Sequence, residues 1–412
     1  MPGRRTLAGR KSVRRDLSAY ARVRHWPPLC IAVVAELEKR HANRWEDETY
    51  AYLMAVAIIT GSGGLIGSQT VHHFVQRGFD VVGLENDMRG LLFGPQASTA
   101  PTTRRLTRAY PREFRSLDID IRDSDAVMRV VRKRATELEL VVHTAAQPSH
   151  DWAASDAQTD FTVNANGTLN LLEAVRQVQP AATFIHMSTN KVYGDRPNNL
   201  PLYETDSRLD LPVDHEYYAG IPVTMPIDHS LHSLFGASKV AADVMVQEYG
   251  RYFDMPTVCF RGGCLTGPGH AGAKLHGFLS YLMKCTVTGE PYTVFGYGGK
   301  QVRDNIHAAD VVRAVELFHS QPRAAAVYNL GGGRASNVSV LEAISLCQRI
   351  AGRELRYVLS DQPRTGDHRW YISDFSDFEH DYPGFNLEYG IEGMLREIHD
   401  TNVERWLQAT IA

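Results

Sequence analysis

The chain has 412 residues, of which 43% are hydrophobic and 22% are charged, and its formal net charge is −3 with neutral histidine. This length and hydrophobic content predict a large buried core in one large or two moderate domains. The slightly acidic balance excludes binding to nucleic acid through a broad basic surface, and the apolar run at 29–35 is too short to span a bilayer. We therefore expect neither nucleic acid nor membrane as a partner.

The five cysteines have no paired or metal-like spacing, and the 17 histidines include no zinc-type motif. We therefore expect reduced thiols, a cytoplasmic location and no bound metal. The first strand of the main domain begins near Ala55. Residues 1–53 are accordingly predicted to be an N-terminal extension with no role in catalysis, whose order the sequence leaves open.

A glycine-rich bend follows the first apolar strand, at 56–60, and leads into an amphipathic helix. Gly61 permits a tight turn, Gly64 lets backbone approach a phosphate, and Gly67 lets the helix pack against the strand. The helix amides and dipole would then face an anion. The pattern predicts a site for a dinucleotide pyrophosphate formed by Gly61, Gly64, Leu65, Ile66 and Gly67.

A second apolar strand, at 81–84, ends in Glu85 and Asn86. Glu85 lies 24 residues after Gly61, near the distance expected for a carboxylate that binds the adenosine ribose hydroxyls. A carboxylate there repels a 2′-phosphate, so NAD is favoured over NADP. The less specific interpretation is a tight strand-to-helix turn followed by a solvated glutamate.

Further strands and helices alternate along the chain. We expect an irregular stretch at 87–111, a third strand at 116–121 that places Asp120 and Ile121 near the adenine, and a fourth strand at 140–143. The fourth strand ends in residues suited to close contact with a cofactor, Thr144, Ala145, Ala146 and Gln147.

A helix at 161–178 that carries Asn164, a strand at 183–187, a helix at 235–252 and a strand at 257–260 follow. This alternation predicts an α/β fold with a doubly wound parallel sheet. The pattern is interrupted at 193–231, a connection long enough to suggest function. We expect a cofactor domain at 54–265 and, interleaved with it, a smaller substrate-binding lobe at 266–412.

The chain resembles the extended short-chain dehydrogenase/reductase superfamily, in particular its nucleotide-sugar epimerases and dehydratases, over residues 55–405. The resemblance lies in Thr60-Gly61 with Gly64 and Gly67, Asp120-Ile121, the segments 143–146, 164–168, 188–194 and 236–239, and Arg303-Asp304 with His307 and Asp310.

Within this superfamily, the segment 188–195 is most similar to the CDP-paratose 2-epimerases. In those enzymes NAD oxidises a sugar hydroxyl to a ketone and returns the same hydride to the other face. The resemblance implies NAD as cofactor, a nucleotide-diphosphate sugar as substrate and a homodimer joined through the helices at 161–178 and 235–252. Thr189 matches the hydroxyl that contacts the reacting oxygen, and Lys239 matches the lysine that binds the nicotinamide ribose.

One position departs from the family pattern. Four residues before Lys239, where the family has a proton-exchanging tyrosine, this chain has Phe235, which carries no exchangeable proton. The chemistry could differ, or activity could be lost with binding retained. We favour a third possibility, a base that has moved to another side chain, with the candidates Lys191, Lys239, Tyr217, Tyr218, Asp228, His229 and His232.

The resemblance also bears on elimination and on substrate binding. The 4,6-dehydratases carry an Asp-Glu pair after the threonine, whereas this chain has Asn190 and Lys191, so dehydration is not expected. Arg303 and Arg364 match family positions that hold the nucleotide diphosphate, with Asp367 as a neighbouring acid. His150 and Trp152 are expected to line the sugar pocket. At 262–264 the usual family contacts are replaced by Gly-Gly-Cys.

Overall fold

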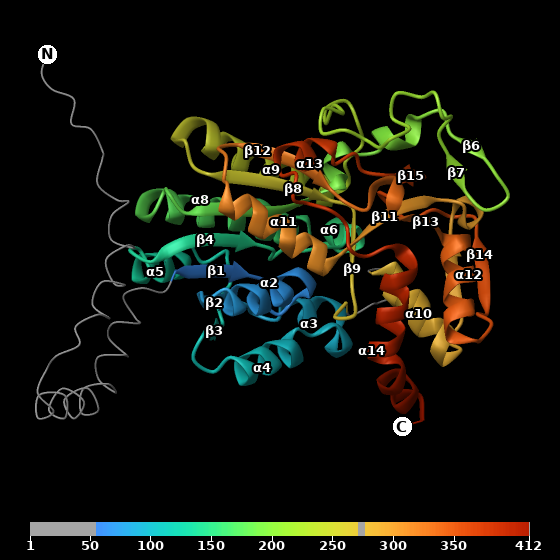
Figure 1. The fold of residues 1–412 in the computed structure, drawn as a ribbon, viewed down its shortest axis with the longest axis horizontal. Coiled ribbons are helices and arrows are strands. Elements are labelled where there is room, and N and C mark those ends of the chain that lie inside the picture. The colour runs from blue at the N-terminus through green and yellow to red at the C-terminus, as the bar shows by residue number, and fades with distance from the viewer. Residues whose placement is uncertain (1–54, 271–276, 412) are drawn as a thin grey trace, which may run out of the picture. The chain divides into compact units, whose positions relative to one another are not determined.

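A parallel sheet of seven strands forms the centre of the fold (Figure 1). The computed structural model describes residues 55–270 and 277–411, so the predicted extension at 1–53 lies outside the described residues. The strand order is β12-β8-β5-β4-β1-β2-β3, with every neighbouring pair parallel. The strands are β1 Val56–Thr60, β2 Asp80–Leu84, β3 Phe114–Leu117, β4 Leu138–His143, β5 Thr183–Thr189, β8 Thr257–Gly262 and β12 Ala326–Leu330.

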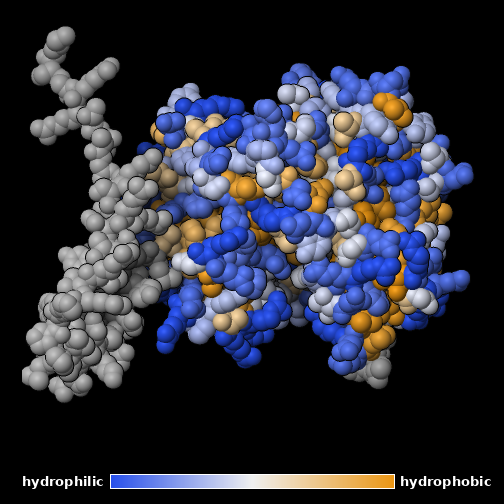
Figure 2. Space-filling model, viewed as in Figure 1, coloured by the Kyte–Doolittle hydropathy of each residue, from blue (hydrophilic) through white to orange (hydrophobic). Residues whose placement is uncertain are grey.

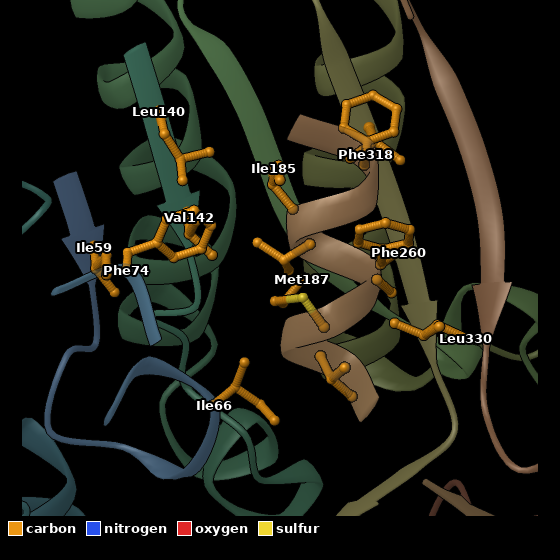
Figure 3. Packing of buried hydrophobic residues seen from close by; sticks show 14 of the residues in the cluster. Ile59, Ile66, Phe74, Leu140, Val142, Ile185, Met187, Phe260, Phe318 and Leu330 are labelled. Atoms are coloured by element: carbon orange, nitrogen blue, oxygen red, sulfur yellow. The ribbon is translucent and has the colours of Figure 1, made fainter. Parts of the chain in front are cut away.

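Helices cover both faces of this sheet, which confirms the predicted doubly wound α/β fold. One face packs against α2 Leu65–Gln76, α4 Ala100–Ala109 and α11 Ala308–Ser320, and the other against α5 Ser124–Lys133, α8 Gly167–Val178 and α9 Ser233–Phe253. Alternate strand residues enter the two cores: Ile59 packs toward α2 and α11, and Ile58 packs toward α5 and α8. Figure 3 shows the first core, in which Phe74, Phe260 and Phe318 lie among strand side chains.

The chain order reverses beside β1, which pairs with β2 on one side and with β4 on the other. The loops that leave the carboxyl ends of these strands diverge to opposite faces, and ligands of open α/β sheets bind in the crevice between them. The glycine-rich bend at 61–64 leaves β1 at this point.

Several sequence-based boundaries are wrong in detail. The stretch 87–111 is not irregular: it contains α3 Met88–Phe93, the 3-10 turn η2 Pro95–Ala97 and α4. Asp87 organises it, because its carboxylate accepts hydrogen bonds from Ser98 Oγ at 2.6 Å and from Thr99 N at 2.7 Å. The third strand ends at Leu117, so the alternation of apolar and acidic residues after it belongs to a turn. The predicted helix at 161–178 is α7 Ala157–Phe161, the π-turn η3 Thr162–Asn166 and α8.

A smaller lobe is built from the C-terminal third of the chain and from the interruption at 193–231. Figure 2 shows that most of the molecular surface on this face, over both lobes, is hydrophilic. Its own hydrophobic core lies between the helices α10 Phe278–Thr288, α12 Val340–Ala351 and α14 Ile391–Ile411. The chain returns to the main sheet for α11 and β12, so the two parts are interleaved. The chain also returns to the main sheet for α13 Ser376–Asp381, whose Phe378 packs in the first core. The lobe and its connections comprise η4 Asn190–Tyr193, η5 Arg196–Asn199, β6 Tyr203–Glu204, β7 Leu209–Asp210, β9 Cys264–Thr266, α10 Phe278–Thr288, β10 Tyr292–Phe295, η6 Tyr297–Gly299, β11 Val302–His307, η7 Gly333–Ala335, β13 Asn337–Ser339, α12 Val340–Ala351, β14 Tyr357–Ser360, β15 Trp370–Tyr371 and α14 Ile391–Ile411.

Among the described residues, none of the helices combines the length and the apolar character needed to cross a bilayer.

A buried ion pair fixes α9 against the sheet. Asp243 on α9 accepts hydrogen bonds from Arg261 on β8 at 2.9 Å and from Ser188 Oγ on β5 at 2.5 Å. Both charged side chains are almost fully buried. Because Ser188 precedes Thr189, and Lys239 lies one helical turn before Asp243, this pair sets the spacing between two expected site residues.

Replacing Asp243 by alanine leaves the Arg261 guanidinium buried without its counter-charge. We expect Asp243→Ala to lower the free energy of unfolding by about 3 kcal/mol or more, measured by urea denaturation. Glu248→Ala breaks an exposed ion pair with Arg251 on the same helix and should cost less than about 1 kcal/mol. Equal small losses in the two variants would show that the buried pair does not hold α9 in place.

Candidate functional site

The bend after β1 leaves no room for a side chain at Gly61 or at Gly67. Gly61 has φ +64°, and a Cβ on Gly67 would lie 2.1 Å from the Gly61 carbonyl oxygen. Gly64 caps α2, and its amide donates to Gly61 O at 2.9 Å. The first turn of α2 therefore presses against the end of β1, and its free amides face a cavity of about 540 Å³. These features fit the pyrophosphate of a dinucleotide.

The cavity wall continues over the ends of β2 and β3. The Glu85 carboxylate accepts hydrogen bonds from Gly63 N and from Asp87 N, each at 2.9 Å, which fixes it at the end of β2. Asn86, Asp120 and Ile121 line the same region. Burial opposes ionisation of Asp120, but hydrogen bonds from Arg122 outweigh it and lower the pKa of the carboxyl. Two carboxylates thus face the end where the sequence places the adenosine.

The end of β4 supplies small residues. Thr144 Oγ donates to Thr60 O at 2.7 Å, and Ala145 N donates to Thr60 Oγ at 3.1 Å. Thr144, Ala145 and Ala146 all line the cavity. This part of the wall is almost entirely backbone, so a flat ligand can lie close to it.

Gln147 and Asn164, expected at the cofactor, lie behind the cavity wall instead. Gln147 N donates to Asn164 Oδ1 at 3.0 Å, and Gln147 Nε2 donates to Asp160 at 2.7 Å. Asn164, in the π-turn, also donates to Ser238 Oγ on α9 at 3.0 Å. These buried amides connect β4, the π-turn and α9, and neither residue is among those that line the cavity.

The next part of the wall combines Thr189, Phe235 and Lys239. Thr189 ends β5, and Phe235 and Lys239 lie one turn apart on α9. Burial lowers the pKa of Lys239 to about 8, and the carboxylates of Asp243 and Asp160 oppose this shift. The phenyl ring of Phe235 is almost fully buried at this part of the wall.

The His150 ring packs edge-on against Phe235, with 4.7 Å between ring centroids, and its Nδ1 bonds to Ser233 Oγ at 2.8 Å. Burial, followed by the charge of Lys191, lowers the pKa of His150 to about 3. His150 lines the cavity as expected, whereas Trp152 does not line it. The Trp152 indole donates to Leu92 O at 3.2 Å and ties α6 His150–Ser155 to α3.

Opposite Thr189, the smaller lobe adds charged groups. Arg303 on β11 donates to Asp367 at 2.5 Å, and Arg364 lines the cavity beside them. Burial would raise the pKa of Asp367, but the charges of Arg303 and Lys191 outweigh it and hold that pKa below its usual range. Two guanidiniums at one end of the cavity suit a diphosphate.

Five of the seven groups considered for a relocated base do not line the cavity. Asp228 and His229 are exposed, with 70% and 89% of their side-chain surfaces accessible. His232 faces two backbone carbonyls, Ser230 O and Val192 O. Tyr217 and Tyr218 pack in a separate hydrophobic cluster around Trp370. Lys191 and Lys239 remain at the wall, and Asn190 lies beside Lys191.

Several residues that line the cavity were not predicted from the sequence. Arg89, Thr99 and Thr102 come from the stretch expected to be irregular, and Tyr292, Phe295 and Gln301 come from the smaller lobe. The Ser98-Thr99 pair before α4 was the available signal for the first group, because hydroxyl residues there can bond to an acid such as Asp87.

Residues 57–331 match the NAD dependent epimerase/dehydratase family. The chain belongs to this family. It is therefore an NAD-dependent enzyme, as the other members of the family are, and the predicted cofactor, NAD, is confirmed. The resemblance noted in the sequence is confirmed with it.

Among relatives, the CDP-paratose 2-epimerase of Salmonella typhi is 29% identical over 325 residues, 77% of this chain and 90% of that protein. A dTDP-glucose 4,6-dehydratase of Xanthomonas campestris pv. campestris is 28% identical over 379 residues, 87% of this chain and 96% of that protein. The structure of the Thermus thermophilus UDP-glucose 4-epimerase complex with NAD matches 84% of this chain and 98% of that one with a TM-score of 0.66 and 24% identity, which shows a shared fold.

Glu85 provides a test of the cofactor end. We expect Glu85→Gln to weaken NAD binding about 10-fold or more, because a charge-assisted hydrogen bond to ribose is worth about 1.5–3 kcal/mol. The ratio of NADP to NAD affinity should rise, since the carboxylate that repels a 2′-phosphate is gone. Calorimetric titration with each dinucleotide measures both effects. Glu404→Gln, at an exposed position on α14, is the control, and equal affinities in the two variants would place the ribose elsewhere.

Proposed function

We propose that this chain is an NAD-dependent nucleotide-sugar epimerase that inverts one sugar carbon, C2 of a CDP-paratose-like substrate. One observation carries the proposal: a single cavity connects the glycine bend at 61–67 with Thr189 and with the arginines of the smaller lobe. NAD supplies a reversible hydride acceptor when it is bound. An activated sugar held between Thr189 and Arg303 would present a carbinol to that acceptor.

The side chains divide the work of holding such a sugar. Arg303 and Arg364 bind the diphosphate, and the ion pair with Asp367 orients Arg303. The Thr189 hydroxyl donates to the reacting oxygen, and Lys239 provides positive charge beside it. The buried Phe235 ring excludes water from this point, which strengthens every charge interaction there. Anchoring the diphosphate end leaves the sugar ring free to present either face.

Dehydration finds no support in the side chains that follow Thr189. Asn190 and Lys191 line the cavity at the positions where the dehydratases of the superfamily carry acids. An amide cannot supply a proton for elimination, and a lysine replaces the glutamate. Overall similarity to dehydratases therefore does not extend to the groups that eliminate water.

Phe235 supports a second candidate function, a protein that binds NAD and a nucleotide sugar without turning the sugar over. Phe235 lines the cavity, and by the resemblance it stands at the position of the tyrosine that exchanges the proton. A related alternative is an oxidoreductase that releases reduced cofactor. These alternatives predict different products from the same substrate.

Incubation with CDP-paratose in deuterated solvent separates the three functions. An epimerase yields the C2 isomer without accumulating NADH, and the inverted carbon carries no solvent deuterium because the hydride returns internally. Nuclear magnetic resonance and absorbance at 340 nm, the ordinary NADH band, follow both products. Stoichiometric NADH would identify the oxidoreductase. Binding without conversion of any nucleotide sugar, together with activity gained in Phe235→Tyr, would identify the silent protein.

The domain and compartment assignments are part of the same proposal. We infer that 54–265 and the returning elements α11 and β12 bind NAD, that most of 266–412 binds the sugar nucleotide, and that 1–53 is dispensable for catalysis. The four cysteines among the described residues are unpaired, which supports a reducing, cytoplasmic compartment.

We also infer a homodimer joined through α8 and α9. Apolar side chains lie exposed on and beside these helices: Phe161 is 48% exposed, Val244 36% and Tyr252 79%. Sedimentation equilibrium at micromolar concentration should give twice the 46.0 kDa chain mass. Val244→Asp should shift the equilibrium toward monomer, whereas Val213→Asp, at an exposed residue of the smaller lobe, should not. A monomeric wild-type protein would contradict the dimer.

A further inference from the structure

The reacting part of the cavity contains three titratable groups that could replace the missing phenol, if the proposed function holds. They are Lys239, His150 and Lys191. Lys239 is nearly fully buried, and its Nζ faces the Met187 carbonyl at 3.5 Å. His150 is a weak base at neutral pH, because its pKa lies near 3. Only Lys191 combines access to the sugar end of the cavity with a basic amine.

Lys191 is held in place by both lobes. Its backbone amide donates to Thr189 Oγ at 3.3 Å, which ties the Lys191 backbone to the residue expected at the reacting oxygen. Its Nζ donates to Gly366 O at 3.0 Å, on the segment of the smaller lobe that carries Arg364 and Asp367. The backbone of Lys191 is therefore tied to Thr189, and its amine is tied to the segment that carries Arg364 and Asp367.

Short contacts also connect this amine to Phe235. A Cβ on Gly366 would lie 2.4 Å from His150 Cε1, so Gly366 touches the imidazole. The same imidazole packs edge-on against Phe235. Phe235, His150, Gly366 and Lys191 thus follow one another around one region of the cavity wall.

The hydrogen bonds of Lys191 accommodate both of its charge states. His368 Nε2 must donate to the Gly194 carbonyl at 2.8 Å, which leaves Nδ1 as an acceptor 3.4 Å from Lys191 Nζ. Gly366 O is the second acceptor. A neutral amine has two N–H groups and one lone pair, and an ammonium has three N–H groups. Loss of one proton therefore breaks neither bond, and the remaining position on Nζ is available to a group in the cavity.

The electrostatic surroundings of the Lys191 amine allow it to gain and lose a proton near neutral pH. Burial is the largest effect and lowers the pKa of Lys191 to about 8; the Asp367 carboxylate opposes it, and Arg303 and Arg364 lower the pKa further. The Cys264 thiol, His150 and His368 complete the titratable groups that face the amine. An amine in this range is a useful base and, once protonated, a useful acid.

We propose that Lys191 Nζ accepts the proton of the reacting sugar hydroxyl and later returns it, in place of the tyrosine that this chain lacks. The O–H and C–H bonds of the carbinol break as its C=O bond forms. The proton goes to the neutral amine, and NAD, when bound, would accept the hydride. In the return step the ammonium gives its proton to the ketone oxygen, and the hydride would return to the other face of the ketone carbon. The proton and the hydride are both returned within one turnover, so the reaction involves no net oxidation or reduction.

Substitution of Lys191 separates proton transfer from binding. Lys191→Arg keeps a positive charge and donors but cannot become neutral, and Lys191→Met removes both. We expect kcat to fall about 10²–10⁴-fold in each, the usual contribution of general acid–base catalysis. KM and bound NAD should change less than about 3-fold in Lys191→Arg if the loss is confined to the transition state. Lys133→Met, on the exposed surface of α5, is the matched control and should retain full activity.

Two pH measurements test the same amine. Because the neutral form of the Lys191 amine is the active base, kcat/KM should rise with pH and level off above about pH 8. The rising part of this pH profile should be absent in Lys191→Met. Independently of activity, labelling of the Lys191 amine by acetic anhydride, followed by peptide mass spectrometry, should have its midpoint near pH 8. Lys133 in the same digest is the internal reference.

The outcomes distinguish the inference from the function on which it rests. If the wild type epimerises and Lys191→Arg retains its rate, the role of Lys191 is overturned and the epimerase stands. A relocated base predicts little gain or a loss of rate in Phe235→Tyr, so a clear rise in rate would show that the base has not moved to Lys191. If no sugar is converted, the labelling midpoint decides, and a midpoint near the ordinary lysine value of about 10.4 overturns the inference.

Discussion

The contact between Gly67 and the Gly61 carbonyl is the constraint on which the site depends. With 2.1 Å between that oxygen and the place of a Cβ, no other residue type fits at 67 without moving α2. The contact brings the first amides of α2 to the end of β1, next to the point where the strand order reverses. An anion there meets backbone donors and the positive end of the helix dipole.

The second constraint is the connection between the two lobes. Lys191 follows β5 of the main sheet, and its amine bonds to Gly366 of the smaller lobe. His368, two residues later, donates back to Gly194. The charged pair Arg303 and Asp367 lies between these bonds. This end of the cavity therefore exists only when both lobes are folded against each other, and burial there shifts pKa values toward the neutral forms of lysine and histidine.

Local patterns in the sequence were sufficient to predict the parallel sheet, because its strands are buried on both faces and appear in the sequence as continuous apolar runs. The glycine bend was predictable for a similar reason, since its geometry admits few residue types. The helices at 88–93 and 100–109 were not predictable, because bonds from Asp87 to Ser98 and Thr99 organise them. Gln147 and Asn164 were expected at the cofactor because sequence cannot distinguish an amide that faces a cavity from one that bonds to a buried neighbour. The position of Lys191 opposite the smaller lobe likewise depends on Gly366, which is 175 residues away.

The proposed function depends on a dinucleotide held by the glycine bend beside Thr189. The most direct measurement is to denature the purified protein, quantify the nucleotide released, and titrate any empty protein with NAD. We predict close to one NAD per chain, present on purification or taken up on titration, and a large loss of uptake in Gly67→Val with the fold retained by circular dichroism. A folded wild-type protein that neither contains nor binds NAD would contradict the account.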